Sequence, residues 1–336
     1  MIMAQDERLE LLTHWLHSLP NWQDAQISVA SSDASTRRYF RATQGQETAI
    51  VMDAPDDHAG VEAFIDISDR LSSIGVYVPK IYAQNRFEGF LLLEDFGDTL
   101  LLDRLDLCTV DELYEEAMKT LMPLQHADTS GLPVYDAEFL RRELEIMPEW
   151  FLGQHLGFMP SDQPRELIDD TFAWLVNEIL QQPQVFVHRD YHSRNLMFTA
   201  KGLGVIDYQG AVLGPVTYDL MSLLRDCYIA WPQKRVELWV DEFRRAAIEN
   251  GSLQPIDQKE FLRWFDLMSL QRHIKVLGIF ARLKHRDGKT GYLNDLPRVL
   301  SYVLLVGERY PETAALIAWM RTQGIPEKIG TVIIPA

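Results

Sequence analysis

Between Val187 and Phe198 the chain reads VHRDYHSRNLMF, a run that places several polar side chains between apolar flanks. Asp190 and Asn195 lie five residues apart in this run, and Asp207 follows twelve residues after Asn195, at the end of the apolar stretch GVID. Transfer of a phosphoryl group to a hydroxyl needs a carboxylate that orients the attacking oxygen and takes its proton, together with oxygen ligands for Mg²⁺. The spacing therefore predicts Asp190 as the base and Asn195 and Asp207 as metal ligands.

Each of these residues has a simpler interpretation when it is taken alone. A single Asp in a loop is usually a turn former or a helix cap, and a His–Asp pair is usually a surface hydrogen bond. Metal-dependent hydrolysis by two carboxylates is a further alternative, but it does not explain the two unequal lobes that the order of elements predicts below. The three residues together, between β-like segments, favour phosphoryl transfer.

The elements that must position these residues differ between the two parts of the chain. The first hundred residues predict an amphipathic helix with Leu9, Leu12, Leu16 and Leu19 near one face, and then a mixture of short strands and a helix. The rest is mainly helical, and a T-x-x-E signature at Thr109 predicts a capping box at the start of one helix. The predicted strands are 38–43, 47–52 and 89–93, with three more in the runs QVFVHRD, NLMF and LGVID, and the predicted helices are 61–74, 109–126, 161–179, 236–250, 258–283 and 296–310.

This order of elements predicts an α+β fold with two lobes. A small β-rich N-terminal lobe would cover residues 1–95, and a large, mainly helical C-terminal lobe would cover residues 96–336. The segment LLLEDFGD, residues 91–98, would join them. A cleft between two such lobes is a common place for a ligand.

Composition narrows the function classes. The formal net charge is −17, so a nucleic-acid backbone or an anionic membrane surface is not an expected partner. The N-terminus has no basic region leading into an apolar run, and no window approaches the roughly 18 apolar residues of a membrane span. With only Cys108 and Cys227, a disulfide framework or zinc site is not expected, and the sequence predicts a cytoplasmic protein.

The segments HRDYHSRN and GVIDYQGAVLGPVTYDL resemble the catalytic and metal-binding segments of the protein-kinase-like fold, in its branch of aminoglycoside phosphotransferases and small-molecule kinases. The resemblance implies ATP and Mg²⁺ as cofactors. It implies the same roles for Asp190, Asn195 and Asp207 as the spacing does. It also implies that Asp219 supports the catalytic loop through its backbone, and that His188 is a brace rather than a base.

The N-terminal part departs from the pattern of that family. Met52 stands where the family has a lysine on the third strand, and no G-x-G-x-x-G loop is present. The run SSDASTRRYFR stands in its place, and we expect its hydroxyls, amides and guanidinium groups to hold the phosphates, because arginine can contact phosphate bidentately. The alternative is a kinase fold that binds a partner and catalyses nothing. The residues expected at the nucleotide are Ser35, Thr36, Arg37 and Arg38, with backbone groups around Glu94 and Phe96 at the adenine.

The runs DASTRRYFR, VMDAP, LLLEDFGD and HRDYHSRNLMF resemble, more narrowly, the bacterial anomeric sugar kinases. That resemblance implies phosphorylation of N-acetylmuramate or N-acetylglucosamine at C1 in cell-wall recycling, with the sugar 1-phosphate passed to a nucleotidyltransferase. His192 and Arg194 lie in the catalytic loop and could approach the sugar. An aminoglycoside kinase, a kinase of the choline or homoserine type, and a non-catalytic binding module remain alternatives.

Overall fold

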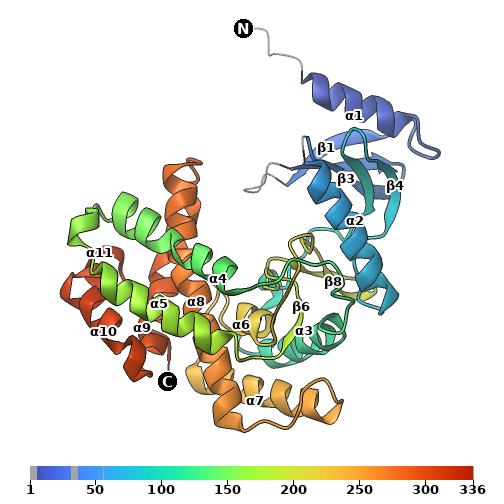
Figure 1. Cartoon of the computed structure of the whole chain (residues 1–336). Helices are drawn as coiled ribbons and strands as arrows, with labels where there is room; N and C mark the ends of the chain where they lie inside the picture. Colours follow the sequence, from blue (N-terminus) through green and yellow to red (C-terminus); the bar gives the residue numbers. More distant parts are fainter. Residues whose placement is uncertain (1–5, 32–36, 56, 336) are drawn as a thin grey trace. The chain divides into compact units, whose positions relative to one another are not determined.

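The computed structural model of the chain describes residues 6–31, 37–55 and 57–335. Contacts within the chain form two compact units (Figure 1). The first unit comprises residues Met1–Thr99 and Met197–Gly210, and the second comprises Leu100–Leu196 and Ala211–Ala336. The lobe boundary expected between residues 95 and 96 stays a prediction.

A five-stranded antiparallel sheet forms the centre of the first unit, with the order β1-β2-β3-β5-β4. The predictions of β2, β3 and β5 are confirmed, whereas β1 was missed and β4 lies in a segment that was expected only to be extended. The strands are β1 (Gln26–Ser31), β2 (Arg38–Gln44), β3 (Glu47–Asp53), β4 (Ile81–Asn85) and β5 (Phe90–Glu94).

One face of this sheet packs on α1 (Glu7–His17). Alternate residues of neighbouring strands, such as Phe40, Val51 and Leu92, form one buried cluster with Leu12 and Leu16 of α1. Side chains two apart in a strand point to the same face, so Phe40 and Ala42 of β2 both enter this core. The apolar stripe that predicted an opening helix is thereby explained.

The first unit also contains α2 (His58–Ser73) and a β-hairpin from a distant part of the sequence. The hairpin pairs β7 (Leu196–Thr199) with β8 (Gly202–Val205), and the Val205 N–H donates to the Tyr77 carbonyl at 2.8 Å. Beyond β8, the ring of Tyr208 packs on Phe64 of α2, with 4.8 Å between ring centroids. These contacts hold the segment that carries Asp207.

The second unit is mainly helical and is built around α8 (Gln258–His285), of which most residues are buried. Its buried residues lie on all sides of the helix and include polar ones such as Asp266, Arg272 and Lys275, so the segment has no single apolar stripe. It packs against a π-helical segment, Met147–His155, and against four of the α-helices whose bounds follow, α5, α6, α7 and α9. The unit contains α3 (Val110–Leu124), α4 (Ala137–Leu144), α5 (Arg165–Ile179), α6 (Tyr218–Leu224), α7 (Gln233–Glu249), α8 (Gln258–His285), α9 (Leu296–Gly307), α10 (Pro311–Thr322), α11 (Ile325–Ile329), and the paired strands β6 (Gln184–Val187) and β9 (Val212–Pro215).

The capping box predicted at Thr109 is wrong. The Thr109 side chain makes no cap hydrogen bond to α3; its hydroxyl instead donates to the Arg104 carbonyl at 2.7 Å. Asp106 accepts the N–H groups of Cys108 and Thr109, so a turn before the helix takes the side chain that the signature assigned to the cap.

Among the described residues, no helix is long and apolar enough to cross a membrane.

Candidate active site

The loop that follows β6 is a tight turn closed by its own polar groups. The Asp190 N–H donates to Nδ1 of His188 at 3.2 Å, the His192 N–H donates to the Asp190 carbonyl at 3.0 Å, and the Asn195 N–H donates to the His192 carbonyl at 2.9 Å. Arg189 adopts a positive φ of 77°, which is uncommon for a residue with a side chain. The turn therefore fixes the residues from His188 to Asn195 as one body, and His188 acts as the brace that the resemblance implied.

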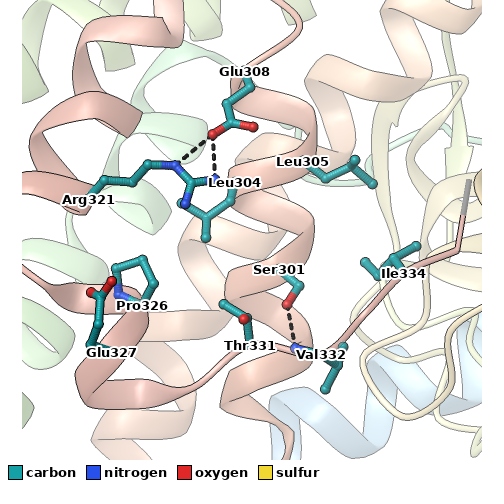
Figure 2. Close-up of a pocket in the computed structure, with 10 residues that line it drawn as sticks. All are labelled: Ser301, Leu304, Leu305, Glu308, Arg321, Pro326, Glu327, Thr331, Val332 and Ile334. Carbon is teal, nitrogen blue, oxygen red and sulfur yellow. Dashed lines mark hydrogen bonds and ion pairs between the residues drawn. The ribbon is translucent and has the colours of Figure 1, made fainter.

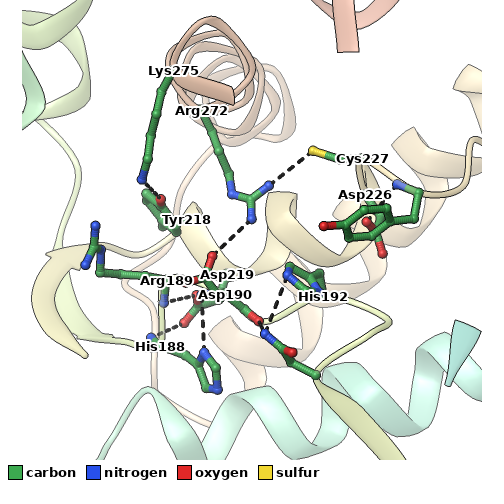
Figure 3. Close-up of polar contacts among 12 residues, drawn as sticks. His188, Arg189, Asp190, His192, Tyr218, Asp219, Asp226, Cys227, Arg272 and Lys275 are labelled. Carbon is green, nitrogen blue, oxygen red and sulfur yellow. Dashed lines mark hydrogen bonds and ion pairs between the residues drawn. The ribbon is translucent and has the colours of Figure 1, made fainter. Parts of the chain in front are cut away.

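Asp219 of α6 anchors the start of this turn (Figure 3). Its carboxylate accepts the His188 N–H at 2.7 Å and the Arg189 N–H at 3.0 Å, and the side chain is fully buried. Burial raises the pKa of Asp219 to about 7, although the two backbone hydrogen bonds oppose this shift. The expected role of Asp219 as a support of the loop backbone is confirmed.

A second buried carboxylate, Asp226, anchors the middle of the turn and was missed by sequence reasoning. It accepts the Ser193 N–H at 3.0 Å and the Ser193 hydroxyl, and its other oxygen accepts the Tyr228 N–H at 3.0 Å. The side chain is 1% exposed. Its position after α6 carries no recognisable motif, because the contact joins residues 33 positions apart.

The Asp190 side chain itself is about half exposed, with 52% of its surface accessible. Desolvation raises the pKa of Asp190, but the nearby Arg272, His192, Lys275 and Arg189 lower it by more. The net result is a pKa of about 2, below the ordinary value of 3.8. Oδ1 of Asp190 lies 3.5 Å from an Nη of Arg272, which comes from α8. An ionised carboxylate of such low basicity can orient a hydroxyl, and it accepts the proton only late in the transfer.

Asn195 uses the nitrogen of its amide inside the loop. Nδ2 donates to the Asp190 carbonyl at 2.9 Å and lies 3.5 Å from Nε2 of His192. The amide oxygen is therefore the atom of Asn195 that could serve a cation, which is the orientation that a Mg²⁺ ligand needs.

Asp207 follows β8 in the first unit and has a positive φ of 64°. Its side chain is exposed, and Oδ1 accepts a hydrogen bond from Nε2 of Gln209 at 2.7 Å. A sparsely populated backbone conformation held at an exposed carboxylate is a common feature of functional positions. Because Asp207 and Asn195 belong to different units, their sharing of one cation stays a prediction.

The residues expected to bind phosphate lie partly outside the described chain. Ser35 and Thr36 fall in the undescribed residues 32–36. Arg37 pairs with Asp57 at 2.9 Å, and Arg38 pairs with the fully buried Asp53 at 2.6 Å. The contacts of Arg37 and Arg38 with phosphate stay predictions. For either guanidinium to bind phosphate, it would have to share that phosphate with its carboxylate partner or leave the partner.

The side chains of the predicted adenine segment pack within the first unit. Glu94 accepts hydrogen bonds from the Tyr77 hydroxyl at 2.8 Å and from Lys201 at 2.7 Å. Phe96 lies against Tyr77, with 4.7 Å between ring centroids, and a Cβ on Gly204 would come within 2.4 Å of its ring. These side chains therefore build the segment, and recognition of adenine by its backbone stays a prediction.

Met52, at the family's lysine position, is fully buried in β3.

His192 and Arg194, expected near the acceptor, both contact Tyr228. The His192 ring lies 5.5 Å from the Tyr228 ring, edge to face, and the Arg194 guanidinium lies 3.6 Å above the centre of the same ring. Burial lowers the pKa of His192, and its Nδ1 is buried without a hydrogen-bond partner in the described part of the chain. Arg194 is exposed, so it is the one of the two with a charge available to a ligand.

A separate pocket lies near the C-terminus of the second unit (Figure 2). It is bordered by the ion pair of Arg321 with Glu308 and by the Val332 N–H, which donates to the Ser301 hydroxyl at 2.9 Å. None of its lining residues is a predicted site residue. The pocket is therefore no part of the candidate site described above.

Residues 26–257 match the phosphotransferase enzyme family. The chain belongs to this family. It is 43% identical over 332 residues to an N-acetylmuramate/N-acetylglucosamine kinase of Pseudomonas aeruginosa, covering 94% of this chain and 96% of that protein. A protein of the same name from Neisseria meningitidis is 39% identical over 313 residues, covering 91% of this chain and 93% of that one.

Solved structures with the same fold confirm the predicted α+β, protein-kinase-like class. An ethanolamine kinase of Plasmodium vivax matches with a TM-score of 0.65 and 13% identity, covering 90% of each chain. The ADP-bound aminoglycoside phosphotransferase APH(2'')-Ib matches with a TM-score of 0.58 and 14% identity, covering 89% of this chain and 98% of that one. The prediction of a kinase-type phosphotransferase is confirmed by the family match, and the non-catalytic alternative loses its support.

Proposed function

We propose that this chain transfers the γ-phosphoryl group of ATP to the anomeric hydroxyl of N-acetylmuramate or N-acetylglucosamine. Two relatives that share about two fifths of its residues over nine tenths of its length carry the name of that activity. The observation that carries the proposal is the loop from His188 to Asn195, which two buried carboxylates hold at its backbone while the Asp190 carboxylate stays ionised and accessible.

Asp190 acts on the acceptor. Its carboxylate accepts a hydrogen bond from the O1 hydroxyl and turns the oxygen lone pair towards phosphorus. As the new O1–P bond forms and the bond to the ADP oxygen breaks, Asp190 takes the O1 proton. An anomeric hydroxyl is more acidic than an ordinary alcohol, so a carboxylate with a pKa of about 2 suffices for late proton transfer.

Asn195 and Asp207 hold Mg²⁺ in this proposal, since amide and carboxylate oxygens are the ligands that Mg²⁺ prefers beside phosphate. The cation would neutralise the charge that develops on the phosphoryl oxygens. Ser35, Thr36, Arg37 and Arg38 contact the phosphates in place of the missing lysine, and the backbone around Glu94 and Phe96 contacts adenine.

The test measures ADP release and sugar phosphate formation with Mg²⁺ATP and each amino sugar. We expect turnover with both free sugars, none with the 1-deoxy sugar, and a loss of at least about a hundredfold for Asp190→Asn. Turnover of the 1-deoxy sugar equal to that of the free sugar would exclude O1 as the attacked atom. Turnover of an aminoglycoside or choline, but of neither sugar, would favour the alternative acceptors.

The product of this reaction is a sugar 1-phosphate, the class of substrate that a nucleotidyltransferase consumes, so we propose such an enzyme as the next to act. Both the ATP requirement and the scarcity of cysteine fit the cytoplasm.

A further inference from the structure

Two cationic side chains of α8 lie beside the catalytic loop, although the sequence separates them from it by about eighty residues (Figure 3). Arg272 and Lys275 are three positions apart, and such residues share one face of a helix. Arg272 is 5% exposed and Lys275 is 9% exposed, so neither charge is a solvated surface group.

Arg272 directs its charge at Asp190. One Nη lies 3.5 Å from Oδ1 of Asp190, and the other donates to Sγ of Cys227 at 3.6 Å. The distance to Asp190 is longer than a direct hydrogen bond, so the pair attracts by charge and leaves the carboxylate lone pairs to an incoming hydroxyl. Asp226 is another carboxylate near Arg272, and its oxygens already accept the N–H groups of Ser193 and Tyr228.

The other two cations of this cluster have a carboxylate partner of their own. Lys275 and Arg189 both pair with a single carboxylate, that of Glu143, at 2.7 Å and 2.6 Å. Asp219 and Asp226 are the other buried carboxylates near Arg272, and both accept backbone N–H groups of the loop or the segment after α6. Arg272 is therefore the cation of this cluster that pairs with Asp190. An acceptor whose hydroxyl reaches Asp190 comes within about 7 Å of the Arg272 guanidinium.

We propose that Arg272 determines the charge of the acceptor, favouring anionic and neutral sugars over cationic ones at the site of the proposed transfer. A unit charge on the substrate that lies about 7 Å from this guanidinium would change its relative transition-state affinity by about tenfold or more. This inference rests on the proposed function and deepens it, because it names what the acceptor side of Asp190 selects.

Three sugars with the same ring separate the effect of charge: N-acetylmuramate is anionic, N-acetylglucosamine is neutral, and glucosamine is cationic below the pKa of its amine. The readout is the ratio of kcat/KM between sugars, measured with Mg²⁺ATP. A ratio cancels any general loss that follows from displacing Asp190, and a merely structural role of Arg272 would not change it.

For Arg272→Gln we expect the ratio of N-acetylmuramate to N-acetylglucosamine to fall, and that of glucosamine to N-acetylglucosamine to rise, each by about tenfold. Arg272→Lys should retain the wild-type ratios. The matched control is Arg263→Gln, on the same helix but paired with Glu178, which should leave both ratios unchanged.

Unchanged ratios in Arg272→Gln would overturn the proposal, as would a shift seen only in Arg194→Gln. If Arg272→Gln does not fold, Arg272→Met, which keeps an unbranched apolar side chain and removes the charge, should shift the ratios in the same directions, and unchanged ratios in that variant would equally overturn the proposal. Absence of turnover with every sugar in the wild type would instead refute the proposed function, so the two failures are distinguishable.

Discussion

Replacing Asp219 by asparagine tests how the catalytic loop is held. The side chain keeps its size and one oxygen, but it loses its charge and the acceptor for one of the two N–H groups, those of His188 and Arg189. Loss of one such hydrogen bond costs about 1.5–3 kcal/mol. Against this, the pKa of Asp219 rises from its ordinary 3.8 to about 7, so the buried charge costs about 4 kcal/mol above that pH.

The sign of the pH dependence follows from that shift. The folded chain binds a proton on Asp219 more tightly than the unfolded chain, so the wild type gains stability as the pH falls through 7 towards 4. The asparagine variant has no such group. We therefore expect Asp219→Asn to be as stable as the wild type, or more stable, at about pH 8, and the wild type to gain about 2–3 kcal/mol on it by about pH 5.

The assay is urea unfolding of both proteins at the two pH values, with kcat measured in parallel. Asp219→Ala, which leaves both N–H groups without an acceptor, is the control and should be less stable than Asp219→Asn at either pH. We expect kcat of Asp219→Asn to fall by about tenfold to a hundredfold, because a small displacement of Asp190 is enough to slow the transfer. An equal stability difference at pH 8 and pH 5 would show that burial does not disfavour this carboxylate.

Three further predictions concern other parts of the chain. Asp207→Ala should lower kcat by about a hundredfold or more and raise the Mg²⁺ concentration needed for half-maximal rate; an unchanged Mg²⁺ dependence would remove this residue from the metal site. Glu143→Gln should destabilise the second unit at neutral pH. Because the paired cations hold the pKa of Glu143 below its usual range, the stability difference between wild type and variant should shrink as the pH falls below about 4, and calorimetry that finds a constant difference contradicts the pairing. Gly204→Ala should lower stability by about 1–3 kcal/mol, since its Cβ would meet the Phe96 ring at 2.4 Å, whereas Gly291→Ala, which meets nothing within 4 Å, should not.

Local patterns accounted for much of the first unit. Strands β2, β3 and β5 follow from short β-like runs, with Gly45 as the turn between the first two. Strand β1 has the same geometry but was not recognised. The capping signature at Thr109 failed because Asp106 and the Arg104 carbonyl offered its polar groups other partners.

The sequence by itself determined the type of chemistry, since Asp190 and Asn195 lie within one loop and their spacing is a local property of the chain. It also supplied Asp219, through the resemblance of its motif to a known family. Only the tertiary structure revealed Arg272 and Asp226 as neighbours of that loop. Their contacts join segments that are distant in sequence, and no local spacing encodes which buried charge on a packed helix will face a given carboxylate.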